Sequence, residues 1–535
     1  MEGTVAAAGR VGYASSRDGE FLADKRDAAS ALLHCALLII LGLLCNMYGL
    51  LHASSVIQGW DGTDLGSIAR NFYRNGFRLL YPQVDWGGNG PGYVEMQFPL
   101  TPFLTALLYR IFGYHEELAI VVPLLSGIGT VLAVYYLARQ MYNVSIGLIA
   151  GFFVAISPYW SWQSTILVND PTMILCGAVG MYMFVRWVED ERLIHYVLAI
   201  AFVSLSVLLK MTALYLGIPL LYLWLTKDGS QVWRDTRFWL FGLLVLVGPA
   251  LWYYHAHQLY VQYGNTFGII FGGSSKFGSK ELLLSPAFYS LVGSRMMRYV
   301  FTPLVCIFVV LGCVTWEKTP TANLFRVWTL GVLLYQLTAA KGTYYGIQYL
   351  MPILPPGAVV AGAKLSSMLD RVRSNRPLRR LANMRIGPAI APLLVLALVA
   401  ASGVWYMRIL QYMEGLDKVR RTIGLTVAQV TRPGSLIIVC SATEDERSAS
   451  SPDQLSREPQ IFYYSDRKGW YSSMRWFDET FLEARRAEGA SCAVIPLEVK
   501  HFVSNHPMYK YLSTHYPELV HTDDCLIYGL DHHIQ

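Results

Sequence analysis

The sequence predicts a polytopic α-helical membrane protein that ends in a small α/β domain. Of its 535 residues, 54% are hydrophobic and 15% are charged, whereas a soluble chain carries about a quarter charged residues. Near residue 410, long apolar runs give way to short β-branched runs separated by polar segments. We therefore expect an N-terminal cytoplasmic segment over 1–27, a transmembrane domain over 28–409 and a separate domain over 410–535.

The transmembrane domain divides into about eleven apolar segments, because a helix needs roughly 20 apolar residues to cross a hydrocarbon core of about 30 Å. The first segment is too long for the core of a signal peptide and is interpreted as a retained helix. The segments cover 28–52, 117–138, 144–162, 171–188, 194–210, 213–226, 238–257, 299–315, 325–340, 346–366 and 387–407.

Basic residues predict the orientation of these helices, since loops rich in Lys and Arg stay in the cytoplasm. The loop 364–386 contains one acid, Asp370, and the basic residues Lys364, Arg371, Arg373, Arg376, Arg379, Arg380 and Arg385. We interpret it as a topology signal that contacts anionic membrane lipids, and not as a nucleic-acid site. We therefore expect the protein in a plasma or inner membrane, with its N-terminus in the cytoplasm. Loop 53–116 and the C-terminal domain are then extracytoplasmic.

The C-terminal domain has the pattern of alternating strands and helices. "GSLIIVCSA" and "ASCAVIPLE" are short β-branched runs, and the segment between them includes the helix-like "SSMRWFDETFLEARRAEG". That segment ends in Gly489, as expected just past a helix. Strand, helix and strand in this order favour a parallel pair joined by a crossover.

The first outer loop begins with "GWDGTDLGSIARNFYRNG", residues 59–76. Apolar residues recur at helical spacing in the segment 64–74, at Leu65, Ile68, Ala69 and Phe72. This spacing predicts an amphipathic helix on the outer face of the bilayer, with Asp61 at or just before its start. From the residues alone, two interpretations stay open: Asp61 or Asp64 either caps this helix or carries out chemistry.

The remainder of the loop favours a functional interpretation. Residues 81–113, "YPQVDWGGNGPGYVEMQFPLTPFLTALLYRIFG", contain Asp85, Glu95 and a second amphipathic stretch that runs into Arg110. A loop of this length between two membrane helices is too long to be a simple turn, and long ordered loops are usually functional.

Four motifs in sequence order resemble the GT-C fold glycosyltransferases, in the branch of protein O-mannosyltransferases and lipid A aminoarabinose transferases. They are the first-loop run "WDGTDLGSIARNFYRNG" with "EMQFPLTPFLTALLYRIFG", then "GLIAGFFVAISPYWSWQSTILVNDPTMILCGAVGMYMF", "SVLLKMTALYLGIPLLYL" and "AKGTYYGIQYLMPILPPGAVV". The resemblance covers approximately residues 30–365 and implies a GT-C type membrane domain.

The resemblance also implies a reaction. A monosaccharide would move from a polyprenyl-phosphate donor to an acceptor hydroxyl on the extracytoplasmic face, with inversion at the sugar carbon. The family's catalytic acid precedes an Ala-Arg pair, which selects Asp61 over Asp64. The family often has Glu directly after that Asp, but this chain has Gly62, so Asp64 or Glu95 would supply the second carboxylate.

The proposed chemistry suits these residue types. A carboxylate near the acceptor can take the proton of its hydroxyl, and cations can stabilise the charge that grows on the leaving phosphate. Lys210 is the first choice for the phosphate, because a lysine at the end of an apolar segment either snorkels to the interface or meets an anion. The predicted phosphate-binding set is Lys210, Lys341, Arg70, Arg298 and Tyr345.

No cofactor is expected to be required, since a monophosphate donor carries less charge than a diphosphate. The weaker alternative is a divalent metal held by Glu95, Asp170 and His255, because carboxylate and imidazole are common metal ligands.

Two other functions stay open. A transporter or flippase for a polyprenyl-linked sugar is the runner-up, although such proteins show repeats and broken helices near the bilayer midplane. A non-catalytic membrane scaffold would explain the C-terminal domain but not Asp61 together with Lys210. As partners we expect a lipid-linked sugar donor, a glycan, lipid or protein acceptor, and membrane lipids.

Overall fold

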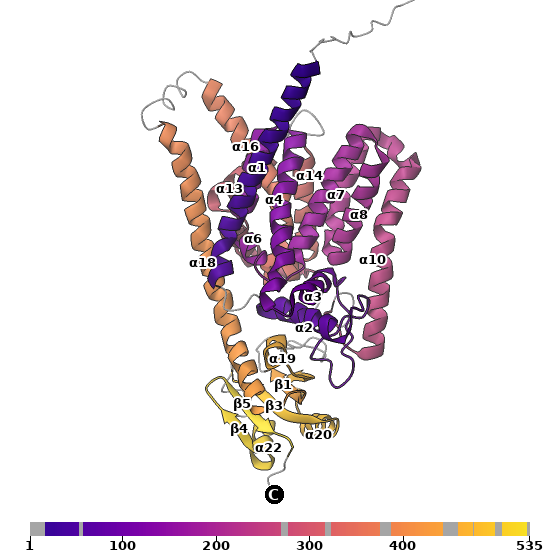
Figure 1. The fold of residues 1–535 in the computed structure, drawn as a ribbon, viewed down its shortest axis with the longest axis vertical. Coiled ribbons are helices and arrows are strands. Elements are labelled where there is room, and N and C mark those ends of the chain that lie inside the picture. Colours follow the sequence, from indigo (N-terminus) through magenta and orange to yellow (C-terminus); the bar gives the residue numbers. More distant parts are fainter. Residues whose placement is uncertain are drawn as a thin grey trace, which may run out of the picture.

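The protein consists of a body of helices, two helices that lie across one end of that body, and a β-sheet domain beyond them (Figure 1). The computed structural model describes residues 17–52, 57–268, 276–315, 323–374, 387–441, 458–473, 476–497 and 506–531. The proposed topology signal in loop 364–386 lies mostly outside the described residues, as does most of the N-terminal segment 1–27.

The helical body contains most of the chain. Its α-helices are α1 (Arg17–His52), α4 (Val121–Met141), α5 (Val144–Ala155), α6 (Pro158–Gln163), α7 (Asp170–Asp190), α8 (Leu193–Leu209), α9 (Gly217–Asp228), α10 (Thr236–Tyr263), α11 (Lys280–Leu284), α12 (Pro286–Arg295), α13 (Pro303–Cys313), α14 (Leu324–Thr338), α15 (Ala340–Tyr345), α16 (Leu354–Ser374) and α18 (Gly387–Val430). Short 3-10 or π turns extend or connect some of them: η1 (Glu116–Ile120), η2 (Met211–Leu216), η3 (Gly229–Arg234), η4 (Met296–Val300) and η6 (Ile347–Ile353).

The multi-pass membrane character predicted from the sequence is confirmed, but the predicted number of about eleven spans is not established. Within the described ranges, 5 helices are long and apolar enough to cross a membrane, and a bent pair formed by Pro286–Val300 and Pro303–Cys313 would raise the number to 6. Several predicted segments are divided. The segment 144–162, for example, forms α5 and α6, because Pro158 starts a new helix after Ser157.

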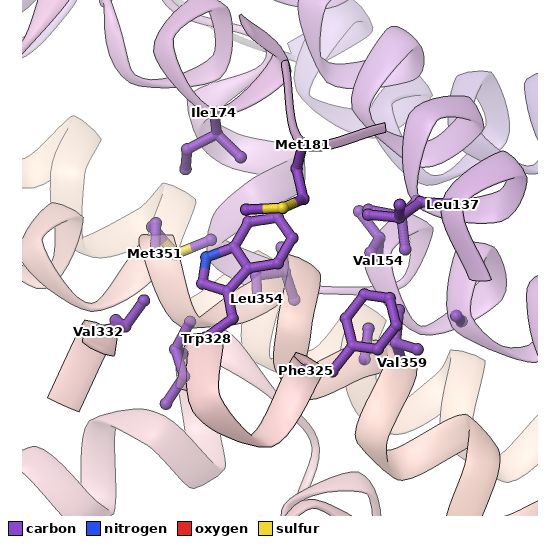
Figure 2. Packing of buried hydrophobic residues seen from close by; sticks show 14 of the residues in the cluster. Leu137, Val154, Ile174, Met181, Phe325, Trp328, Val332, Met351, Leu354 and Val359 are labelled. Carbon is purple, nitrogen blue, oxygen red and sulfur yellow. The ribbon is translucent and has the colours of Figure 1, made fainter. Parts of the chain in front are cut away.

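The centre of the helical body is tightly packed. Figure 2 shows Trp328 of α14 pointing toward Met181 of α7, with Met351 of η6 beside the same ring. Each of these side chains is at most 1% exposed. Gly312 lets α13 approach α16 closely, since a Cβ there would lie 2.5 Å from Val360 Cγ1. Close helix packing of this kind holds the ends of the helices, and the side chains they carry, in fixed positions.

The start of α1 and the C-terminal domain lie at opposite ends of the helical body, and α18 runs alongside the body into that domain (Figure 1). Because α18 continues without a break to Val430, the predicted boundary at residue 410 falls inside a helix. The sheet domain begins beyond that helix.

The first outer loop forms α2 (Gly59–Asn75) and α3 (Leu100–Phe112), which lie between the helical body and the C-terminal domain (Figure 1). The predicted helix 64–74 is present but starts five residues earlier, at Gly59, whose φ of 68° suits glycine. Asp61 therefore lies in the first turn and not before it. The predicted position of the helix on a bilayer surface was wrong, because residues 62–72 are all buried.

The C-terminal domain contains a five-stranded sheet with the order β2-β1-β3-β5-β4. Its elements are β1 (Leu436–Ser441), α19 (Pro459–Ser465), β2 (Lys468–Ser473), α20 (Glu479–Ala487), β3 (Ala490–Pro496), α22 (Pro507–His515), β4 (Glu518–His521) and β5 (Cys525–Gly529). The predicted parallel pair is confirmed as β1 and β3. The predicted helix before Gly489 begins only at Glu479, since residues 472–473 belong to β2, a second parallel neighbour of β1.

Candidate active site

A buried ion pair defines the candidate site. Lys210, at the C-terminal end of α8, donates a hydrogen bond from Nζ to Oδ1 of Asp170 at 2.8 Å. Asp170 is the first residue of α7, where Pro171 occupies the first turn. The two side chains are 14% and 6% exposed. The ring of Tyr349 lies 5.4 Å from the ammonium, so the lysine has an anion and an aromatic face beside it.

Asp61 belongs to the same electrostatic cluster. The negative charge of its carboxylate interacts electrostatically with the ammonium of Lys210 and with the hydroxyl of Tyr349. The carboxylate of Asp170 interacts with the same two groups. Asp61 of α2, Asp170 of α7 and Lys210 therefore lie close enough for their charges to interact. Helix α2 itself lies at the end of the helical body that faces the C-terminal domain (Figure 1). The sequence placed Asp61 and Lys210 at one face, and in the structure the charge of Asp61 acts on Lys210.

The three residues predicted as metal ligands do not form a cluster. Asp170 pairs with Lys210, and His255 donates from Nε2 to the carbonyl of Leu80 at 2.8 Å. Glu95 lies instead beside His257, whose Nδ1 is 3.4 Å from its Oε1. In the part of the chain that the structure describes, no group of three or more His, Cys, Asp or Glu side chains could hold a metal ion.

Glu95 is completely buried in the first outer loop. Thr266 donates a hydrogen bond to Oε2 of Glu95, and the backbones of the two residues form a parallel bridge. Burial raises the pKa of Glu95, while the hydrogen bonds from Thr266 and His257 partly oppose that shift. Glu95 thus joins the outer loop to α10 and to the segment that follows it.

The second predicted carboxylate, Asp64, holds part of the same loop. Trp86 donates from its indole nitrogen to Oδ1 of Asp64 at 2.8 Å, and Asp64 is 8% exposed. This contact fixes the large Trp86 side chain against α2.

Arg70, predicted to bind the donor phosphate, contacts the C-terminal domain and the outer loop. Its guanidinium donates to Asp85 Oδ2 at 2.7 Å and to the carbonyl of Tyr463 at 3.0 Å, and it also lies 3.2 Å from Asp466. With 5% exposure, this side chain is enclosed by those partners. We therefore assign it to the interface between α2 and the C-terminal domain, because its charge is already neutralised there.

Asp466 belongs to the same interface. Burial alone would raise the pKa of Asp466, but the neighbouring Arg74 and Arg70 hold that pKa below its usual value. Arg74 donates to Asp466 Oδ1 at 2.7 Å, in a pair whose side chains are 46% and 48% exposed.

The remaining predicted phosphate contacts lie on the surface. Lys341 and Tyr345 are exposed residues of α15, and Tyr345 makes an edge contact with Tyr344. Arg298 is also exposed, and its guanidinium lies 5.4 Å from the centre of the Trp405 ring.

Sequence reasoning did not single out Tyr349, although it lies inside the quoted "AKGTYYGIQYLMPILPPGAVV" segment. It also missed Asp417, which precedes the C-terminal domain on α18 and contacts the start of α2. No sequence pattern signals that contact, because the two residues are 358 positions apart.

Comparison with solved structures identifies the fold. ArnT from Cupriavidus metallidurans matches with a TM-score of 0.61 at 14% identity, over 94% of this chain and 98% of ArnT. An oligosaccharyltransferase from Archaeoglobus fulgidus matches with a TM-score of 0.59 at 14% identity, over 91% of this chain and 72% of that protein. The chain therefore has the GT-C glycosyltransferase fold, as the resemblance noted in its sequence implied.

Sequence comparison finds two partial similarities. The profile of the dolichyl-phosphate-mannose-protein mannosyltransferase family matches residues 96–254, a segment that contains Asp170 and Lys210 and begins after Asp61. YycA from Bacillus subtilis (strain 168), described as a mannosyltransferase, is 23% identical over 154 residues. That match covers 29% of this chain and 22% of YycA.

Replacing Arg70 with Ala is expected to lower the free energy of unfolding by about 3–5 kcal/mol, because Asp85 would stay buried without its cation. Arg74→Ala is the matched control, since its exposed pair with Asp466 is expected to contribute at most about 1 kcal/mol. Denaturant unfolding of both variants in detergent micelles measures the difference. Equal losses in the two variants would contradict a specific role for the buried pair.

The raised pKa of Glu95 predicts a pH-dependent stability. The folded state favours the protonated form of Glu95. The stability that protonated Glu95 contributes is therefore fully present below the usual pKa of 4.5 and is lost as the pH rises through the folded pKa. The melting temperature of the wild type, relative to that of Glu95→Gln, is therefore expected to fall as the pH rises above 4.5. Thermal unfolding of both proteins across this range tests the prediction, and a constant difference would refute it.

Proposed function

We propose that this protein is a polyprenyl-phosphate-sugar-dependent glycosyltransferase. It transfers one monosaccharide from a lipid monophosphate donor to an acceptor hydroxyl on the extracytoplasmic face of the membrane, with inversion. The observation that carries the proposal is the convergence of Asp61 with the buried Lys210–Asp170 pair at one end of the helical body. A base and a cation whose charges interact are the groups that this reaction needs.

The first chemical role is that of the base. Asp61 accepts the proton of the acceptor hydroxyl as its oxygen attacks the anomeric carbon of the donor sugar. The bond between that carbon and the phosphate oxygen breaks, and its electron pair stays on the phosphate. A single displacement of this kind inverts the configuration at the anomeric carbon.

The second role is stabilisation of the leaving group. Lys210 faces a phosphate whose negative charge grows as the glycosidic bond breaks, so its attraction is stronger in the transition state than in the ground state. Asp170 keeps the ammonium in place through a hydrogen bond of 2.8 Å. A lysine confined in this way loses little conformational freedom when the donor binds.

The neighbouring structures support the donor class. ArnT from Cupriavidus metallidurans is known with bound undecaprenyl phosphate, and the archaeal oligosaccharyltransferase AglB from Archaeoglobus fulgidus is known with a dolichol-phosphate. By analogy of fold, we assign this chain a lipid phosphate donor, and a glycan, lipid or protein acceptor. No metal is part of the proposed mechanism, since Lys210 supplies a fixed cation for a donor with a single phosphate.

Asp61→Asn is expected to reduce the turnover number by about 10²–10⁴-fold, because an amide cannot accept the proton. The assay incubates purified protein in lipid nanodiscs with a panel of radiolabelled polyprenyl-phosphate sugars and measures the consumption of each donor. Glu117→Gln, which neutralises an exposed acid of the same outer region, is the control and should retain wild-type turnover. Consumption of no donor by folded wild-type protein would refute the proposal.

Lys210→Met is expected to reduce turnover by about 10²–10³-fold and also to destabilise the protein, since Asp170 would lose its buried partner. The double variant Lys210→Met with Asp170→Asn separates the two effects. It is expected to recover most of the thermal stability without recovering turnover, as measured by melting temperature and donor consumption. Recovery of both would show that the pair has only a structural role.

A further inference from the structure

The start of α2 is held by a residue of α18. Gln58 precedes α2 and provides no side-chain cap, so the amide groups of the first turn depend on other partners. The backbone N–H of Gly59 donates to Oδ1 of Asp417 at 3.3 Å. Asp417 is 5% exposed, and its carboxylate lies at the positive end of the α2 dipole.

Tyr464 of α19 completes this contact. Its hydroxyl lies 2.9 Å from Oδ2 of Asp417 and 2.7 Å from the carbonyl oxygen of Ile57. One hydroxyl therefore connects the capping carboxylate to the backbone that leads into α2. Asp61, the proposed base, follows Gly59 by two residues in the same helical turn.

The elements that carry Asp417 and Tyr464 are themselves fixed to each other. A Cβ at Gly424 of α18 would lie 2.8 Å from Cβ of Tyr464, so the two helices touch at this point. Arg420 of α18 also forms a buried ion pair with Glu458, at the start of α19. Neither Asp417 nor Tyr464 can therefore move far without displacing its helix.

We propose that Asp417 and Tyr464 are positioning residues that set the place of Asp61 in the active site. The inference rests on the proposed role of Asp61 as the base. Proton transfer requires the carboxylate within hydrogen-bond distance of the acceptor hydroxyl, and a displacement of about 1 Å can cost about 10²-fold in rate. The C-terminal region thus takes part in catalysis by fixing the first turn of α2.

A second contact makes this role separable from folding. Further along α2, Arg70 bonds to Asp85 and to the carbonyl of Tyr463, independently of Asp417. Loss of the cap at Gly59 should therefore loosen the first turn while the remainder of α2 stays docked. The expected defect is in turnover and not in the binding of the donor.

The test compares Asp417→Ala, Asp417→Asn and Tyr464→Phe with the wild type in lipid nanodiscs. Glu414→Ala is the control, since Glu414 is an acid one turn earlier on the same helix. Asp417→Ala is expected to lower kcat by about 10–100-fold with the donor KM within about twofold. Amide exchange of peptides that cover residues 57–63 should become about five- to tenfold faster, while β1 and β3 keep wild-type exchange.

Asp417→Asn keeps an oxygen that can accept from Gly59, so it should lose less turnover than Asp417→Ala. If Asp417→Ala does not fold, Asp417→Asn and Tyr464→Phe decide the question by the same measurements. Wild-type exchange and turnover in all folded variants would overturn the proposal, as would a defect confined to the donor KM. If the wild type itself transfers no sugar, the glycosyltransferase proposal fails, while unchanged exchange at 57–63 would separately overturn the capping role.

Discussion

The structure depends on the burial of α2, a helix that carries charged residues on a surface enclosed by protein. Buried polar and charged groups are tolerated only when they have partners, because each one loses its hydration. Asp64 has the indole of Trp86, and Arg70 has Asp85 together with the carbonyl of Tyr463. These partners come from the outer loop and from the C-terminal domain, so α2 can be buried only when both are in place.

The C-terminal domain is consequently joined to the outer loop through backbone as well as side chains. Gly469 of β2 donates from its N–H to the carbonyl of Asp85 at 3.0 Å, and its own carbonyl accepts from Gly88 at 2.6 Å. Trp86 lies between those two loop residues in the sequence. Its ring packs edge-on against that of Tyr471, with 5.5 Å between the ring centroids. The domain therefore lies against the outer loop that carries α2. Its contacts set the position of α2 relative to the membrane helices.

The sequence was informative wherever one periodic pattern determines the structure. Hydropathy located the helical segments, and the spacing of Leu65, Ile68 and Phe72 correctly predicted the helix that contains them. Its earlier start was not predictable, because glycine is a poor helix former and the partner of Gly59 lies on α18. The strand β2 was missed since "KGWYSS" contains no β-branched residue, and its backbone pairing with β1 and the outer loop stabilises it instead.

The sequence did not identify the partners that the structure gives to Lys210 and Arg70. Asp170 and Lys210 are 40 residues apart, and their contact depends on how α7 packs against α8. Arg70 resembled a surface cation because the helical pattern alone could not show that the C-terminal domain covers it. Sequence periodicity reports which face of a helix is apolar, whereas the choice among several possible counter-charges is made by tertiary packing.

The charge balance of the site explains how one lysine can serve two anions in succession. Before the donor binds, Lys210 and Asp170 neutralise each other, which makes the burial of both tolerable.

The proposed donor is a phosphodiester with about one negative charge, and the polyprenyl phosphate that leaves is a monoester with about two. In the proposed reaction, Asp61 would lose its charge when it takes the acceptor proton, so negative charge would move from α2 toward the phosphate. The charges of Asp61 and Asp170 act on Lys210. In the proposed reaction, the attraction between Lys210 and the leaving phosphate would strengthen as its interaction with Asp61 disappears. Catalysis by a single lysine would then require Asp61 to be held at a fixed place relative to Lys210. The burial of α2 between the helical body and the C-terminal domain would hold it there.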